Sequence, residues 1–543
     1  MSRPTYDLAV VGSGGAGLVA ACAAADRGLS VIVLESTDFL GGTTALSGGQ
    51  MWIPCSPAMI RAGITDSTDA AMAYLQRVTL GVSPAANLRS FVENAPSFIT
   101  YLEEELNIPV VNIDRPDYHP EWAGAAMGRT VEPLPVPAQD LGAWKERTRT
   151  SPTRRPVTGP ETRTGMDNVL VAEREASDVR TQGSGLVAGL VSAALRRGVE
   201  LQIRARVTSV SRSAGHFVLG TEDEEIGAQN VVLASGGFAR SADLRRDFLP
   251  PLEIVPTAAP GSLGDSLRLG MALGGRLRGM SEAWWTAAAS IKGETIDGVP
   301  LYRNVVRELA YPGSILVNAA GVRFVNEASS YNDLGKSFYT FDAAAHRFPN
   351  QPAWLIFDAN FRSTRPVAGI GPSAPAPKEF IEADDLSSLA RKCGIHASAL
   401  HLTVAENNNS AQTGADRRFS RGANAHDRFN GDEAHQPNPC LGPITEPPFF
   451  AVPITLGANG TKGGLVTDEF SRVLDHQGAQ ISGLFAVGES AAALMGPGYA
   501  GSGASLGPAL TSAFTLADKL SPLTTTARHG DNPSSTNRQA SLS

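Results

Sequence analysis

The stretch that decides the fold is residues 6–35, YDLAVVGSGGAGLVAACAAADRGLSVIVLE. Residues 8–11 form an uninterrupted apolar run, which is typical of a central parallel strand buried on both faces. The glycines that follow predict a tight turn, and the small residues 16–25 predict a helix that can lie close to a sheet. Gly28 ends this helix, and residues 29–34 return as a second strand. The sequence therefore predicts a β-α-β unit at its start.

Three glycines in this unit have the spacing of a dinucleotide-binding turn, because Gly12, Gly14 and Gly17 give G-x-G-x-x-G. The first permits the tight turn, the second lets the backbone approach a pyrophosphate, and the third lets the helix pack on the strand. N–H groups at the helix N-terminus would face the phosphates. Glu35 lies close to the position, about 20 residues on, of the acid that binds a ribose hydroxyl. Together these features predict nucleotide binding.

Other glycine-rich segments favour FAD over NAD as the nucleotide. Residues 41–49, GGTTALSGG, would let the backbone lie against a flat ring system, and residues 231–237, VVLASGG, supply another strand and turn. Val207 lies in a predicted strand that would meet the adenine, and residues 262–275 predict a helix near the cofactor. The predicted contacts are Gly12, Gly14, Ala16, Gly17, Glu35, Ser36, Gly42, Thr43, Thr44, Ser47, Gly48, Gly49, Val207, Ala234, Gly236, Asp265, Gly488, Glu489, Ser505 and Leu506.

A matching segment lies at the opposite end of the chain. Residues 483–507, GLFAVGESAAALMGPGYAGSGASLG, predict a strand over 484–487, a glycine-rich turn and a helix. An acid at the end of that strand, Glu489, would bind the ribityl chain. One FAD held by both ends of the chain explains both segments. We expect it to be bound noncovalently, since no histidine lies beside the 41–49 loop.

Composition excludes several functional classes. A net charge of −8 gives no electrostatic footprint for a nucleic acid. The cysteines and histidines show neither a disulfide framework nor metal-ligand spacing, so we expect a reducing cytoplasm and no metal. We see no signal peptide and no apolar run of about 18 residues that would span a membrane. We therefore expect a cytoplasmic protein, free or in peripheral contact with a membrane.

The fold class we predict is α/β: a Rossmann-type FAD-binding domain with an inserted α+β substrate domain. The chain of 543 residues is long enough for both. We place the FAD-binding domain at residues 1–280 and 449–520, and the substrate domain at 281–448. The last residues, 521–543, are rich in Ser, Thr and Asn and predict a disordered tail.

Further motifs carry a resemblance to a known family. They are GGTTALSGGQMWIP, PDYHPEWAGAAMGRTVEPLP, GVRFVNEASSYNDL, RGANAHDRFNGD, GTKGGLVTD and MGPGYAGSGASLGPALT, in this order. The chain up to about residue 520 resembles the 3-ketosteroid Δ1-dehydrogenases, within the flavoprotein group that includes fumarate reductases. The resemblance implies a small apolar cyclic ketone substrate, a steroid first of all, and an external electron acceptor such as a quinone.

The resemblance also implies roles for four residues. Tyr499 and the backbone N–H of Gly503 match the donors to the substrate carbonyl, Tyr331 matches the base that removes the α-proton, and Tyr118 matches its hydrogen-bonding helper. The chain departs from the family at Ala500 and Ser502, where prolines usually flank the glycine. Losing prolines should loosen the loop, because proline restricts φ.

These departures leave the substrate open between a steroid and a smaller cyclic ketone or terpenoid enone. Trp122, Trp284 and Trp285 either line an apolar pocket or pack in the core. A second hypothesis is a fumarate-reductase-like enzyme that reduces an unsaturated acid, for which Arg303, Arg307 and Arg323 would supply positive charge. A third is a flavin-containing binding or redox-sensing protein without efficient turnover.

Overall fold

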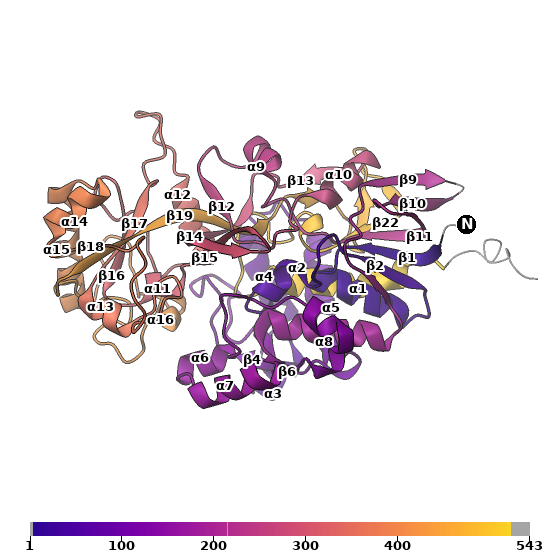
Figure 1. Cartoon of the computed structure of the whole chain (residues 1–543), viewed down its shortest axis with the longest axis horizontal. Coiled ribbons are helices and arrows are strands. Elements are labelled where there is room, and N and C mark those ends of the chain that lie inside the picture. The colour runs from indigo at the N-terminus through magenta and orange to yellow at the C-terminus, as the bar shows by residue number, and fades with distance from the viewer. Residues whose placement is uncertain (1–3, 214, 523–543) are drawn as a thin grey trace, which may run out of the picture.

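The computed structural model describes residues 4–213 and 215–522 (Figure 1). Strand β1 (Thr5–Val11) lies in the middle of a mostly parallel sheet, between β2 (Val31–Leu34) and β11 (Glu225–Leu233). β11 also pairs in parallel with β22 (Gln480–Ala486), which leads into the second glycine-rich segment. Both ends of the chain therefore meet in one sheet, as their sequences predict. The sheet is extended by β8 (Glu200–Gln202), β9 (Ser209–Ser213), β10 (His216–Gly220) and β21 (Arg472–Leu474).

Helices close one face of this sheet. α1 (Gly15–Ala25) is almost entirely buried, and α17 (Leu506–Thr515) packs directly against it. α8 (Gln182–Arg196) packs on α1, and α5 (Ala85–Glu104) packs on α17. The small side chains of α1 allow this close approach of helix to helix and helix to sheet. The N-termini of α1 and α17, predicted from segments almost 500 residues apart, thus lie side by side.

The prediction that Val207 lies in a strand is wrong. β9 begins at Ser209, and Val207 lies in an irregular segment just before it. In this segment Arg204 has a left-handed φ of 59°, and the Ala205 N–H donates to the Glu35 carbonyl across the end of β2. The chain is turned there, so it cannot pair as a strand. The helix expected over residues 262–275 is shorter, α10 (Asp265–Ala272).

A second sheet lies at the other end of the molecule (Figure 1). Its longest strands, β14 (Ala283–Ile296) and β19 (Phe449–Thr461), pair antiparallel. β19 also pairs with β12 (Ile254–Pro256), so this sheet takes a strand that precedes residue 281. The predicted domain boundaries stay a prediction, and the predicted disorder of 523–543 lies outside the described residues. The other strands here are β15 (Val299–Asn304), β16 (Ser314–Asn318), β17 (Ala353–Asp358) and β18 (Ile381–Ala383).

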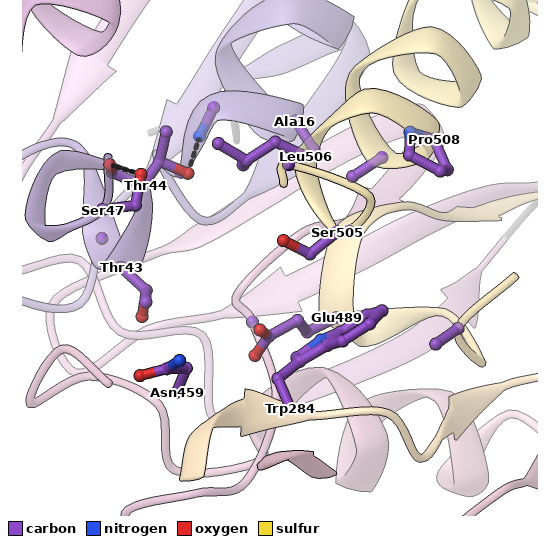
Figure 2. A pocket seen from close by; sticks show the side chains of 18 of the residues that line it. Ala16, Thr43, Thr44, Ser47, Trp284, Asn459, Glu489, Ser505, Leu506 and Pro508 are labelled. Carbon is purple, nitrogen blue, oxygen red and sulfur yellow. Dashed lines mark hydrogen bonds between the residues drawn. The ribbon is translucent and has the colours of Figure 1, made fainter. Parts of the chain in front are cut away.

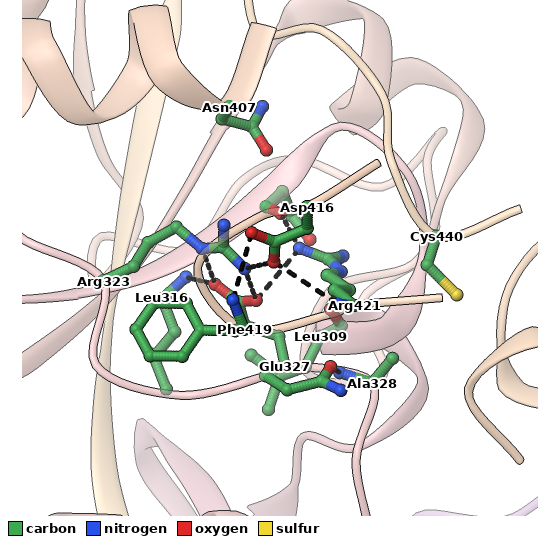
Figure 3. A network of polar contacts seen from close by, with 12 residues as sticks. Leu309, Leu316, Arg323, Glu327, Ala328, Asn407, Asp416, Phe419, Arg421 and Cys440 are labelled. Atoms are coloured by element: carbon green, nitrogen blue, oxygen red, sulfur yellow. Dashed lines mark hydrogen bonds and ion pairs between the residues drawn. The ribbon is translucent and has the colours of Figure 1, made fainter. Parts of the chain in front are cut away.

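A buried ionic network fixes the loop between β16 and α12 (Tyr331–Phe338) (Figure 3). Arg323 donates to both oxygens of Glu327, at 2.8 and 2.6 Å, and also to Asp416 at 2.9 Å. Arg421 lies 3.3 Å from Glu327 and donates to the carbonyl oxygen of Ser314 at 2.7 Å. Because Glu327 is four residues before Tyr331, the network anchors the start of α12.

The remaining elements surround these two sheets. Short strands are β3 (Met51–Trp52), β4 (Val110–Ile113), β5 (Thr130–Pro133), β6 (Val136–Pro137), β7 (Val179–Arg180), β13 (Leu277–Arg278) and β20 (Gly464–Leu465). The helices are α2 (Gly42–Leu46), α3 (Pro57–Arg61), α4 (Thr68–Val78), α6 (Gly159–Thr164), α7 (Asn168–Ser177), α9 (Ala242–Phe248), α11 (Arg307–Ala310), α13 (Ala359–Thr364), α14 (Leu386–Cys393), α15 (Ala397–Thr413) and α16 (Ala425–Asn430). No described helix is long and apolar enough to cross a membrane.

Candidate active site

A cavity of about 610 Å³ opens between the two sheets, beside the N-termini of α1 and α17. It brings together nearly every residue that the sequence predicts for the site. Of the predicted cofactor contacts, Gly17 alone does not line it, and all four predicted catalytic residues do. The predicted cofactor contacts and the predicted catalytic tyrosines thus line one continuous cavity.

The glycine turn has the geometry of a pyrophosphate cradle. Gly12 has a φ of 107°, and a Cβ there would lie 2.5 Å from the Ala234 carbonyl oxygen. A Cβ on Gly17 would lie 2.1 Å from the Gly12 carbonyl oxygen, so only glycine lets α1 pack this closely on β1. A Cβ on Gly14 would meet no described atom within 4 Å, because that side of the turn faces the cavity. These residues therefore fit the dinucleotide that the sequence predicts.

Polar side chains order the walls around this turn. Glu35 directly follows β2 and accepts hydrogen bonds from the hydroxyls of Ser13 at 2.5 Å and Thr37 at 2.9 Å. Thr44 accepts one from the Gly15 N–H at 3.1 Å, which joins α2 to the start of α1. The Ser47 hydroxyl caps this region by donating to the Thr44 carbonyl at 2.7 Å, as Figure 2 shows. Asp265 also lines the cavity, but its carboxylate forms an ion pair with Arg206 at 2.7 Å.

Glu489 faces the cavity from the C-terminal segment, together with Asn459 and Trp284 (Figure 2). Burial raises the pKa of the Glu489 carboxyl to about 8. The backbone N–H groups of Thr461, at 3.4 Å, and of Gly237 contact this carboxyl and partly offset the effect of burial on its pKa. A buried acid with so few partners has capacity for a further donor, and a ribityl hydroxyl would supply one.

Three tyrosines from distant segments form a triangle at the other end of the cavity. The ring centres of Tyr118 and Tyr331 are 5.8 Å apart. The ring centre of Tyr499 lies 5.3 Å from each of these two. Burial raises the pKa of Tyr331 well above its ordinary value, and the neighbouring phenols of Tyr118 and Tyr499 raise it further. Burial raises the pKa of Tyr499 to about 12, so its hydroxyl stays protonated and can donate.

The segments that carry Tyr118 and Tyr331 are joined next to these rings. His119 Nε2 lies 3.0 Å from an Asp333 carboxylate oxygen, in the first turn of α12. The His119 ring stacks on Trp122 at 3.7 Å, with an angle of 4° between the planes. Trp122 therefore supports this junction. Trp285 is buried in the core, whereas Trp284 lines the cavity 5.0 Å from the Tyr499 ring.

Hydrogen bonds hold the loop that contains Ala500 and Ser502, the two residues that replace the prolines usual in the family. The Ala500 carbonyl accepts from the Tyr74 hydroxyl at 2.7 Å and from the Tyr118 N–H at 3.0 Å. The Ser502 hydroxyl donates to the Gln50 side chain, and the Ser502 carbonyl accepts from Thr130 at 3.2 Å. Gly503 follows with a φ of 84°, and a Cβ there would lie 2.3 Å from the Gln50 carbonyl oxygen. These contacts restrict the loop where prolines are missing.

Several cavity-lining residues were not predicted from the sequence, among them Gln50, Asn459, Arg115 and Arg163. Asn459 directly precedes the GTKGG motif, but no local pattern indicates that its side chain would face the cavity. Of the arginines considered for an acid substrate, Arg307 lines the cavity. Arg303 instead pairs with Glu294 at 2.7 Å, and Arg323 belongs to the buried network.

Comparisons with known proteins agree with this geometry. The FAD binding domain family matches residues 7–506. The 4-oxocyclohexanecarboxylate 2-dehydrogenase of Sinomonas cyclohexanicum is 38% identical over 539 residues, covering 94% of this chain and 92% of the relative. The 3-oxosteroid 1-dehydrogenase of Mycobacterium tuberculosis is 31% identical over 561 residues, covering 95% and 98%.

A solved structure is similar over the whole chain. The 3-ketosteroid Δ1-dehydrogenase from Sterolibacterium denitrificans, in complex with 1,4-androstadiene-3,17-dione, aligns with a TM-score of 0.88 and 34% identity. The alignment covers 95% of this chain and 99% of that one. The chain belongs to the FAD binding domain family, and it is an FAD-dependent oxidoreductase of the group that includes the 3-oxosteroid 1-dehydrogenases.

Proposed function

We propose that the enzyme removes two hydrogens from the CH–CH bond next to the carbonyl of a six-membered cyclic ketone, giving a conjugated enone. The observation that carries this proposal is the Tyr118, Tyr331 and Tyr499 triangle at one end of the FAD cavity. FAD bound in the cavity would accept the hydride from the β-carbon. We also propose that it is bound noncovalently.

In this proposal the Tyr499 hydroxyl and the Gly503 N–H donate to the substrate carbonyl. Such donors stabilise the negative charge that develops on the oxygen as the α-proton leaves. Tyr331, as phenolate, takes that proton, and Tyr118 stabilises the phenolate through its own hydroxyl. The phenolate is costly because burial and the neighbouring phenols raise the Tyr331 pKa. The Tyr118 hydroxyl is buried, and its ring centre lies 5.8 Å from that of Tyr331, so it is close enough for this role.

Two substrate types follow from the relatives: a 3-ketosteroid, or a smaller ketone such as 4-oxocyclohexanecarboxylate. The reduced flavin would pass its electrons to an external carrier such as a quinone. The reverse reaction on an unsaturated acid is less well supported, since Arg303 and Arg323 are engaged elsewhere.

Anaerobic flavin bleaching tests the proposal. The FAD-loaded enzyme is mixed with androst-4-ene-3,17-dione or with 4-oxocyclohexanecarboxylate, and the visible flavin band is followed while the products are analysed. We expect bleaching and an equivalent amount of enone from at least one ketone, and loss of both in Tyr331→Phe with FAD still bound. Bleaching by neither ketone, or near-normal rates in Tyr331→Phe, would overturn it. If the enzyme instead oxidises a reduced dye with fumarate and turns over no ketone, the fumarate-reductase-like hypothesis would be favoured.

A further inference from the structure

Three arginines from separate segments line the cavity around one phenylalanine. They are Arg115, in the loop after β4, Arg163 on α6 and Arg307 on α11, and we call them the arginine cluster. The guanidinium carbons of Arg115 and Arg163 lie 5.0 and 3.9 Å from the centre of the Phe429 ring. α11 packs against α16, which carries Phe429. The cluster therefore brings three segments that are far apart in the sequence to one place in the cavity.

The positive charge of the cluster is only partly neutralised by the protein. Arg163 donates to the Phe429 carbonyl at 3.0 Å and lies 3.5 Å from Glu433, whose side chain is 90% exposed. Arg115 donates to the Asn430 side-chain oxygen at 2.9 Å, and its buried Nε has no partner among the described residues. Neither Arg115 nor Arg307 forms an ion pair within the part of the chain that the structure describes.

Electrostatics show that the three charges act on one another. Burial lowers the pKa of Arg163, and the positive charges of Arg307 and Arg115 lower it further. The acids that face the cluster are Asp114, Glu433 and Glu308. Burial raises the pKa of the Glu308 carboxyl, which weakens it as a counter-charge. An anion from outside the chain would relieve this repulsion, and a guanidinium fork matches the geometry of a carboxylate.

We infer that the arginine cluster binds a carboxylate of the substrate, so that the substrate is a cyclic keto acid. This inference rests on the proposed dehydrogenation and narrows its substrate. Burial raises the pKa of Tyr499, whose hydroxyl would bind the ketone, and the positive charge of Arg115 opposes this rise. The guanidinium carbon of Arg115 also lies 5.4 Å from the centre of the Tyr118 ring, so the cluster adjoins the tyrosine triangle. A fused steroid skeleton would instead cover the guanidinium groups without supplying a negative charge, which is unfavourable.

The test compares 4-oxocyclohexanecarboxylate with its methyl ester, which keeps the ketone and removes the charge. For the FAD-loaded enzyme we expect kcat/KM for the acid to exceed that for the ester by about 10–100-fold, because the ester loses a charge pair with partly buried guanidinium groups. Arg163→Gln and Arg307→Gln should each lower kcat/KM for the acid about 10–100-fold and leave the ester unchanged. Arg163→Lys should retain part of the preference. Arg246→Gln, at a 73% exposed side chain, is the control and should change neither.

A binding experiment separates this inference from the proposed reaction. Cyclohexanecarboxylate and cyclohexanecarboxamide have no ketone, and their affinities are measured by calorimetry on the same FAD-loaded proteins, with flavin absorbance as the check on folding. Tighter binding of the carboxylate, lost in Arg163→Gln and Arg307→Gln, supports the subsite even if no ketone is dehydrogenated. Equal affinities, or equal kcat/KM for acid and ester, would overturn the subsite while leaving the dehydrogenase in place.

Discussion

The ammonium group of Lys462 lies 2.7 Å from the carbonyl oxygen of Gly498, the residue directly before Tyr499. It also donates to the Pro497 carbonyl at 3.0 Å. Its Nζ is 4.6 Å from the centre of the Trp284 ring, which itself packs on Tyr499. A single lysine, 2% exposed, thus holds Tyr499, the tyrosine that we propose binds the ketone, both through the backbone and through a neighbouring ring.

Replacing Lys462 by Met should lower kcat about 100-fold while leaving FAD bound. The change removes two hydrogen bonds that position Tyr499, and small displacements of a positioning group cost rates of this size. Steady-state kinetics with a ketone substrate and the flavin absorbance spectrum measure the two effects. Lys336→Met is the matched control, because Lys336 is more exposed and pairs with Glu282 instead. An unchanged kcat in Lys462→Met would contradict the positioning role.

The stability of the protein should depend on pH through the same lysine. Burial lowers the pKa of Lys462 to about 7, well below its value in an unfolded chain. Between pH 7 and about 10.4 the unfolded state binds the proton and the folded state does not, so the free energy of unfolding rises with pH. The stability gained from the neutral lysine is present above about pH 10.4 and is lost progressively as pH falls to 7. Urea unfolding measures the free energy of unfolding of the wild type and of Lys462→Met. The value of the wild type should increase relative to that of the variant as pH rises. A difference independent of pH would refute this.

The rate of ketone dehydrogenation should rise with pH up to at least about pH 10. The proposed base is the Tyr331 phenolate, and both burial and the adjacent phenols raise the pKa of this residue. Each fall of one pH unit below that pKa therefore reduces the reactive fraction about tenfold. Single-turnover flavin reduction measured across pH 6–10 gives the profile. A plateau already reached below pH 8 would argue against a phenolate at Tyr331.

Replacing Glu327 by Gln should destabilise the protein by about 3–5 kcal/mol, because a buried ion pair loses one partner and leaves the other charged. Both Arg323 and Arg421 would be left with excess charge in the core. Thermal unfolding monitored by circular dichroism measures the loss. The surface pair of Arg89 and Glu93 provides the control, since Glu93→Gln removes an exposed contact worth under about 1 kcal/mol. Similar losses in the two variants would show that the network does not stabilise the fold.

The loop that carries Gly503 should depend on Ser502. In Ser502→Ala the hydrogen bond to the Gln50 side chain is lost, and the Gly503 N–H loses part of its restraint. We expect kcat to fall about 3–10-fold, the equivalent of a single hydrogen bond of about 1 kcal/mol. Ser502→Pro, which restricts φ, should recover the rate. A further loss in Ser502→Pro would mean that the hydroxyl, and not loop rigidity, is what matters.

The sequence was sufficient for those parts of the protein that depend on local pattern. The β-α-β unit, the roles of Gly12 and Gly17 and the use of FAD follow from glycine spacing and apolar runs, because a tight turn and a close helix leave little choice of residue. The family, the fold class and the oxidoreductase activity are confirmed by the comparisons. The catalytic roles of Tyr118, Tyr331, Tyr499 and Gly503 stay predictions.

Only the tertiary structure decided which side chains meet in the cavity. Arg115 and Arg163 lie in the cavity wall beside Phe429 only because segments that are far apart in the sequence converge there, and the Lys462 contact with Gly498 likewise depends on the fold. Among the candidate arginines, Arg307 faces the cavity while Arg323 is buried with Glu327 and Asp416. Charge pairing of this kind depends on distances across the fold, which residue order alone does not specify.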